Sequence, residues 1–88
     1  MSVIFHLEAV FTIGPHTILT GTIKEGVLKP KMKFNLDKKV LEVEKIESYG
    51  KALASAISGS KIGISFTNLS SSDLSSLKPL IRKDIAFY

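Results

Sequence analysis

Val10–Gly26 reads Val-Phe-Thr-Ile-Gly-Pro-His-Thr-Ile-Leu-Thr-Gly-Thr-Ile-Lys-Glu-Gly. Two apolar runs stand on either side of the Gly-Pro turn, and a second turn follows at Glu25-Gly26, so the stretch predicts two extended segments. In the second, Thr17, Leu19, Gly21 and Ile23 share one face. Gly21 packs no side chain there, which indicates a bulge, a bend at a barrel corner or another backbone close by. Two strands alone are marginal in water, so the remaining chain is expected to complete their sheet.

The rest of the chain supplies further short extended segments. Val3–Ile13 alternates, and its odd residues, up to Phe11 and Ile13, are predicted to face the core. The other predicted strands are Lys31–Leu36, Val40–Tyr49 with a bulge near Glu44-Lys45, Lys61–Asn68 with Ile62, Ile64 and Phe66 inward, and Ile85–Tyr88. Val27–Pro30 is predicted to be a connection. A single helical turn is predicted from a Ser72 cap through Leu77, and Pro79 ends it.

This spacing of strands, without a sustained helix, predicts an all-β fold: a small closed antiparallel β-barrel of six or seven strands. Closure would also remove the exposed strand edges of a small sheet. We expect residues 1–88 to form a single domain, since 88 residues suffice for one small domain and no more.

Composition excludes several classes of protein. Hydrophobic residues make up 44% and charged residues 23%, which is a globular mixture. Cysteine is absent, which rules out disulfides and thiolate zinc sites and is compatible with a reducing cytoplasm, where we expect the protein. No signal peptide is apparent, and no apolar run approaches the ~20 residues of a membrane helix, so no membrane partner is expected. The formal net charge of +4 is compatible with an acidic partner such as RNA.

The opening stretch resembles the start of the second, β-barrel domain of translational GTPases such as elongation factor Tu and the selenocysteine-specific elongation factor. The positions that match the family pattern are Val10, Phe11, Ile13, Thr17, Ile18, Leu19, Thr20, Gly21, Ile23 and Gly26. Ala56–Ile64 and Ile81–Ile85 are similar to later motifs of the same domain, so the resemblance covers nearly the whole chain. The chain departs from the family at Pro30-Lys31, Ser60 and Lys83. The resemblance implies the barrel fold much more specifically than a function.

Catalytic chemistry finds little support in the sequence. There is no Gly-x-x-x-x-Gly-Lys-Ser/Thr loop and no Asn-Lys-x-Asp guanine reader, so we expect no nucleotide binding and no enzyme activity. His6 and Glu8 would share one strand face, and an exposed pair is the favoured interpretation. His16 lies in a tight turn, and two histidines without a third ligand make a poor zinc site. We therefore predict no metal and no cofactor.

Basic residues offer a candidate RNA-binding surface. Lys29, Lys31 and Lys33 are predicted to lie on the outer face of one strand, and Lys38 and Lys39 at the following turn. Phosphates favour such a stripe, and a merely solubilising lysine surface is an equal alternative.

The resemblance adds a second candidate region. In elongation factor Tu the barrel helps hold the aminoacyl end of transfer RNA, and the family glutamate near the terminal adenosine falls on Glu47. The aromatic two residues on falls on Tyr49, and Lys51 follows. Pro15 and Gly50 stand where the family has arginines, which leaves aminoacyl-end recognition open.

Three functional hypotheses follow from the sequence. The first is a non-catalytic, stand-alone translation-factor-like barrel that binds RNA or a ribonucleoprotein. The alternative is a protein-interaction adaptor that docks on a GTPase or another partner without contacting RNA. The third, for which the His6 and Glu8 pair is the one hint, is a subunit or fragment of an enzyme.

Overall fold

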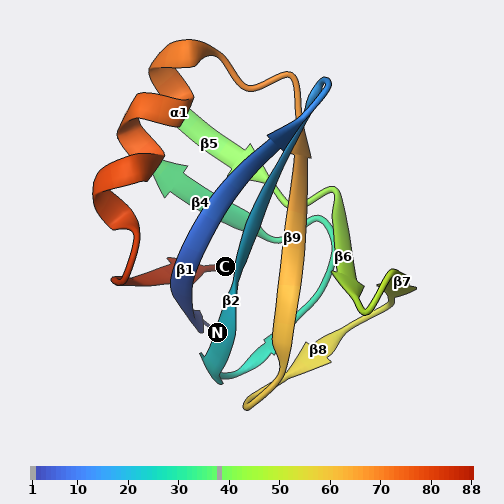
Figure 1. The fold of residues 1–88 in the computed structure, drawn as a ribbon. Helices are drawn as coiled ribbons and strands as arrows, with labels where there is room; N and C mark the ends of the chain where they lie inside the picture. The colour runs from blue at the N-terminus through green and yellow to red at the C-terminus, as the bar shows by residue number, and fades with distance from the viewer. Residues whose placement is uncertain (1, 38) are drawn as a thin grey trace.

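The structure, a computed structural model, describes residues 2–37 and 39–88. These residues form antiparallel β-sheets and one short helix (Figure 1). The elements in chain order are β1 (Val3–Ile13), β2 (His16–Glu25), β3 (Val27–Leu28), β4 (Lys33–Leu36), β5 (Lys39–Glu42), β6 (Lys45–Ser48), β7 (Lys51–Leu53), β8 (Ala56–Ile57), β9 (Lys61–Thr67), α1 (Ser71–Leu77), a 3-10 turn η1 (Lys78–Leu80) and β10 (Asp84–Phe87). No helix in the described ranges is long and apolar enough to cross a membrane.

Three sheets organise these strands. The largest has the order β10-β1-β2-β9-β6-β7, and two ribbons pair β3 with β8 and β4 with β5. Backbone hydrogen bonds extend the pairing beyond these sheets: the amides of Lys33 and Tyr88 each donate to the other residue's carbonyl, at 2.6 and 2.9 Å. The amide of Lys31 donates to the Val43 carbonyl at 2.7 Å, and the amide of Glu44 donates to the Ser65 carbonyl at 3.2 Å. The β4-β5 ribbon is thus tied to β10 at one end of the main sheet and, through the residue Glu44 that follows it, to β9.

The core is built from the inward faces of these strands. On β2 and β9 the buried apolar residues are those that alternation predicted, including Leu19, Ile23, Ile64 and Phe66. A group of aromatic rings fills the centre: Phe87 meets Phe5 edge-on at 6.0 Å between ring centroids and lies 5.5 Å from the Phe34 ring. Edge-to-face and tilted pairs of this kind are favourable beyond their buried area.

A β-bulge in β1 makes the prediction for the end of that strand wrong. Leu7 pairs with Gly21 but Ala9 pairs with Thr20, so Glu8 is the extra residue. Because strand side chains alternate, one extra residue moves every later side chain to the opposite face. Phe11 and Ile13 are consequently 53% and 63% exposed, while Val10 packs against the core.

Gly21 allows β1 and β2 to approach closely beside this bulge. A Cβ atom placed on Gly21 would lie 2.0 Å from the His6 carbonyl oxygen and 2.8 Å from Cζ of Phe5. The Phe5 ring therefore occupies the space that any side chain at position 21 would need. This confirms the expectation of another backbone close by.

The predicted strand Val40–Tyr49 is interrupted where a bulge was expected. β5 ends at Glu42 and β6 begins at Lys45, and the break brings Leu41, Val43 and Ile46 all into the core. β4 is shorter than predicted, because Lys31 has a positive φ of 76° and cannot continue an extended strand. Val27–Pro30, predicted to be a connection, contains the two-residue strand β3.

The helix begins two residues earlier than predicted, because its cap is Ser70 rather than Ser72. The Ser70 hydroxyl accepts from the Asp73 amide at 3.1 Å, and the Asp73 carboxylate accepts from the Ser70 amide at 3.0 Å. This reciprocal capping box satisfies two amides that the first helical turn leaves without partners. Pro79 ends the α-helix as predicted, although the chain continues as the 3-10 turn η1.

Candidate nucleic-acid interface

Tyr49 and Gly50 form the two-residue turn between β6 and β7. Both have positive φ, 51° and 77°, and Ser48 pairs with Lys51 across the turn. Tight hairpin turns of this kind favour Asn-Gly, and a bulky side chain at positive φ is a strained exception. The Tyr49 side chain is also 99% exposed, so no packing within the chain compensates for the strain. Strain retained at an exposed aromatic residue points to a binding role.

A surface groove of about 310 Å³, hereafter the outer groove, lies beside this turn. The residues that line it are Glu8, Thr20, Gly21, Glu47, Ser48, Tyr49, Lys61, Ile62 and Gly63. Its floor follows from the strand register, in which Gly63 of β9 lies between Glu47 of β6 and Thr20 of β2. Because Gly63 has no side chain, the outer face of the sheet is hollow at this point.

The outer groove carries charges of both signs. The Glu47 side chain is about one-third exposed, and its Oε1 lies 3.4 Å from Nζ of Lys45. Lys61 is exposed at the start of β9, and its carbonyl accepts a hydrogen bond from the Ser48 hydroxyl at 3.3 Å. This bond ties the Tyr49 turn to the neighbouring strand. The site thus offers the carboxylates of Glu8 and Glu47, two nearby ammonium groups and an aromatic ring.

A second hollow of about 250 Å³ adjoins the first along the same face, and Glu47 lines both. Ile13, Ile18 and Ser65 give it an apolar or small lining, and His16 and Glu44 stand at its side. The Thr67 hydroxyl donates to Glu44 Oε2 and lies 3.4 Å from Nδ1 of His16. These contacts tie the β1-β2 turn to the end of β9.

The predicted lysines do not line the outer groove. Lys29 borders a different hollow after β3, Lys31 lies in the turn before β4, and Lys33 is on the outer face of β4, where alternation placed it. Lys39 is bound to Asp73, with 2.7 Å between Nζ and Oδ2. Lys38 lies outside the described residues, and Lys51 is exposed directly after the Tyr49 turn.

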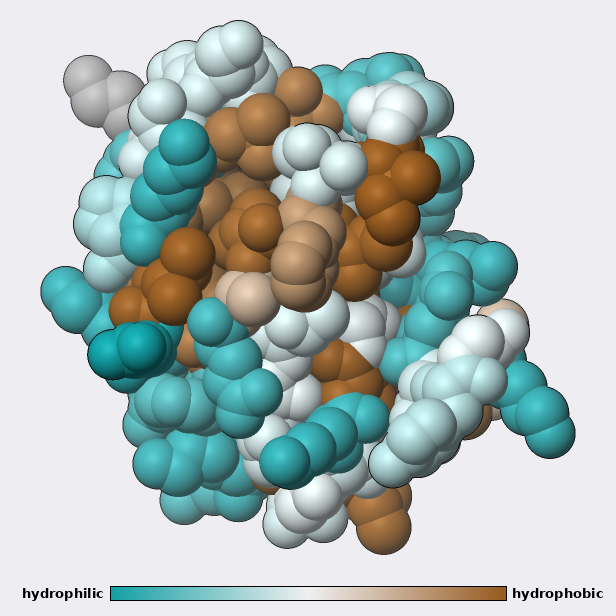
Figure 2. Space-filling model, viewed as in Figure 1, coloured by the Kyte–Doolittle hydropathy of each residue, from teal (hydrophilic) through white to brown (hydrophobic). Residues whose placement is uncertain are grey.

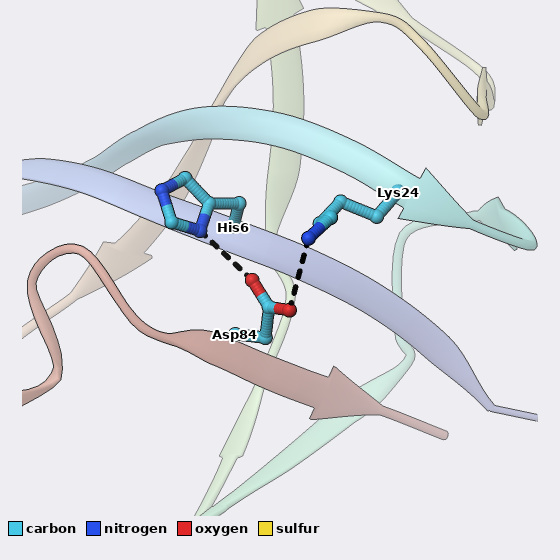
Figure 3. Close-up of polar contacts among 3 residues, drawn as sticks. All are labelled: His6, Lys24 and Asp84. Atoms are coloured by element: carbon cyan, nitrogen blue, oxygen red, sulfur yellow. Dashed lines mark hydrogen bonds and ion pairs between the residues drawn. The ribbon is translucent and has the colours of Figure 1, made fainter.

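The structure pairs His6 with Asp84 rather than with Glu8. His6 Nδ1 lies 2.8 Å from Oδ1 of Asp84, and Lys24 Nζ donates to Oδ2 at 3.2 Å, so one carboxylate links β1, β2 and β10 (Figure 3). The His6 hydrogen bond, followed by that of Lys24, holds the pKa of Asp84 below its ordinary value. Within the described ranges, no group of three or more potential ligands is placed to hold a metal ion.

Seven of the nine lining residues of the outer groove were not predicted from the sequence, among them Glu8, Thr20 and Lys61. These three come from β1, β2 and β9, and only the strand register brings them to the Glu47 turn. One signal was present, because Gly63 lies in the middle of a strand, where glycine often marks the close approach of another molecule.

Comparison with solved structures places this fold in a known class. The chain has a fold similar to a domain of translation factors, as its arrangement of antiparallel strands matches a crystal structure of that class. The matched structure is a bacterial selenocysteine-specific elongation factor, EF-Sec, with a TM-score of 0.73 and 19% sequence identity over 97% of this chain. The chain spans 14% of the length of that factor. No protein-family model matches the sequence, and no curated protein matches it.

Proposed function

We propose that the chain is a non-catalytic, cytoplasmic RNA-binding module, whose outer groove takes one unstacked nucleotide of a single-stranded RNA or ribonucleoprotein. Residues 1–88 form a single domain in this proposal. The observation that carries it is Tyr49, a fully exposed ring held at positive φ on the rim of the groove. Single-stranded RNA is recognised chiefly by stacking of unpaired bases on such rings, at about 1–3 kcal/mol per base.

The groove supplies partners for the other parts of a nucleotide. The Glu47 carboxylate accepts hydrogen bonds, which suits a ribose hydroxyl or an exocyclic amine. Lys61 at the groove and the exposed Lys51 after the Tyr49 turn would contact phosphates. Lys29, Lys31 and Lys33 would offer further contacts along a longer strand, as would Lys39 if it left its ion pair with Asp73. The proposal involves neither a nucleotide cofactor nor a metal.

We also infer that the sheets close into one barrel of six strands. β10, β1, β2, β9 and β6 are consecutive neighbours in the main sheet. The paired hydrogen bonds of Lys33 with Tyr88 join β4 to β10, and that of Lys31 with Val43 joins β4 to the segment leading into β6. A closed barrel holds the outer groove on a rigid wall, which suits a site that must not bend on binding.

Tyr49→Asn tests the RNA proposal because it should move stability and binding in opposite directions. Asparagine suits the turn, so the free energy of unfolding should rise by up to about 1 kcal/mol. Loss of stacking should weaken binding of a short fluorescent single-stranded RNA at low salt by roughly tenfold. Tyr88→Leu removes the other exposed tyrosine and serves as the matched control. Unchanged RNA affinity in Tyr49→Asn would refute the proposal, as would absence of RNA binding by the wild type.

A second pair of variants separates the groove from the lysines of β4. Lys61→Gln should lower the slope of log affinity against log salt by about 0.7, the value of one single-strand phosphate contact. The double variant Lys31→Gln and Lys33→Gln removes two such contacts, so it should lower the slope by about 1.4 for a long RNA and leave the slope for a short one unaffected. If both variants keep the wild-type slope of log affinity against log salt, these lysines do not contact phosphates and only keep the surface soluble.

A further inference from the structure

An apolar groove, hereafter the helix groove, lies between α1 and the far half of β1. It encloses about 430 Å³ and is lined by Val10, Thr12, Leu74, Lys78 and Ile81. Figure 2 shows apolar side chains gathered on the face where α1 lies beside β1. None of these residues belongs to the outer groove described above. The helix groove is therefore a separate surface.

The bulge in β1 is the reason that the strand side of this groove is apolar. The extra residue Glu8 places Val10 and Thr12 on the inward face of β1. Their partners on β2, Leu19 and Thr17, are both buried. Val10 is only partly buried, since the hairpin extends beyond the best packed part of the core. Bulges recur where a protein must re-aim a side chain beside a functional surface.

The other side of this groove comes from α1, from η1 and from the residue that follows η1. Leu77 is fully buried, and Asp73, one turn earlier, caps the helix. The groove is lined by Leu74 of α1, by Lys78 of η1 and by Ile81, which follows η1 and also packs against the core. Leu74 and Ile81 each remain partly exposed. The exposed parts of these two side chains are therefore available to a partner.

The charge at the helix groove is positive. Lys78 lines it, and Arg82 and Lys83 follow Ile81 in the exposed turn. Among the described residues, no carboxylate lies within ion-pair distance of Lys78, Arg82 or Lys83. Asp84, the acidic residue nearest in sequence, is bound by His6 and Lys24. An apolar floor with a cationic rim complements an acidic amphipathic segment.

We propose that the helix groove binds an acidic, leucine-rich peptide segment of a partner protein. The apolar side chains of the segment would fill the space between Val10, Leu74 and Ile81, and its carboxylates would face Lys78 and the following turn. RNA fits less well, because no aromatic ring lines the helix groove and a base would have nothing to stack on. The proposal does not depend on RNA binding at the outer groove.

The test uses two synthetic peptides and the methyl NMR signals of Val10, Leu74 and Ile81. In one peptide pairs of leucines alternate with pairs of glutamates, and in the other lysines replace the glutamates. The acidic peptide should shift all three signals and bind at least about tenfold more tightly than the basic one. Lys78→Glu should narrow or reverse that preference. It changes an exposed side chain, so folding should be unaffected.

Two further variants give the matched comparison. Leu74→Asp should weaken binding of the acidic peptide by roughly tenfold or more, since it puts a charge into the apolar floor. Phe11→Ala alters the neighbour of Val10 on the opposite face of β1 and should leave the affinity unchanged. Equal affinity for the two peptides, equal losses in Leu74→Asp and Phe11→Ala, or unshifted groove signals would each overturn the proposal. A short RNA that shifted the same methyl signals and displaced the acidic peptide would overturn it in favour of a nucleic-acid site.

Discussion

Gly21→Ala should be among the most damaging single substitutions in the chain, even though it adds only one methyl group. The new Cβ would lie 2.0 Å from the His6 carbonyl oxygen, which is backbone, and 2.8 Å from the Phe5 ring. Real Cβ contacts of this kind lie beyond 3 Å. The two strands would therefore have to separate by more than 1 Å where they are paired most closely.

Gly21→Ala should lower the free energy of unfolding by more than an ordinary overpacking substitution in a core does. Adding a methylene group to a well-packed interior typically costs about 1–3 kcal/mol, and more where the obstacle is backbone. Phe5 would also have to leave its edge-on contact with Phe87. We therefore expect a loss of about 3–5 kcal/mol, against a total stability of about 4–13 kcal/mol for a chain of this length. The midpoint of thermal unfolding should fall by more than about 12 °C.

Gly63→Ala provides the control on the opposite face of the same sheet. Its Cβ would lie 3.2 Å from Cγ2 of Ile18, a side-chain atom that can move by a few tenths of an ångström. Urea unfolding of the two variants should therefore differ by at least about 2 kcal/mol. A Gly21→Ala variant within about 1 kcal/mol of the wild type would show that β1 and β2 are not held together as described.

Three further substitutions test other parts of the fold. Phe66→Ala should cost about 3–5 kcal/mol by urea unfolding, because the ring is 2% exposed within the face that β9 turns inward. Ser70→Ala removes the helix cap and should cost about 1 kcal/mol by the same assay. The hydrogen bond from Lys39, and then that from the Ser70 amide, hold the pKa of Asp73 below its ordinary value. The Asp73 carboxylate therefore stabilises the fold when the pH is above its pKa in the unfolded chain, and this stabilisation is lost as the pH falls through its lower pKa in the folded chain. Asp73→Asn should accordingly flatten the fall in melting temperature below about pH 4, measured by circular dichroism.

Alternation of apolar residues predicted the inward faces of β2 and β9, because these two strands pair with each other in unbroken register. It was wrong for the end of β1, since the sequence around Glu8 contains no signal of the extra residue. The parity conflict among Leu41, Val43 and Ile46 did reveal the second irregularity, because three apolar residues cannot share a face of an unbroken strand.

The candidate site was predictable only in part. Glu47 and Tyr49 were found through the resemblance to translation factors, but the strain at Tyr49 depends on a backbone angle that local sequence does not fix. Lys61 joins them only through the pairing of β6 with β9. The contact between His6 and Asp84 spans 78 residues of sequence, and no local pattern can indicate a pairing over that distance.

The pairing of β1 with β10 has a consequence for how the chain acquires its structure. Val3 lies opposite Phe87, so β1 cannot form all its strand pairs until β10 has been synthesised. During synthesis β1 and β2 can meet early, but Phe5 and Phe34 lack the ring that packs between them until Phe87 has left the ribosome. Closing so long a loop is costly before its contacts form, and folds dominated by distant pairings take milliseconds to seconds rather than microseconds. We expect a nascent chain that ends before β10 to remain incompletely folded, and a chain that includes β10 to fold in one cooperative step.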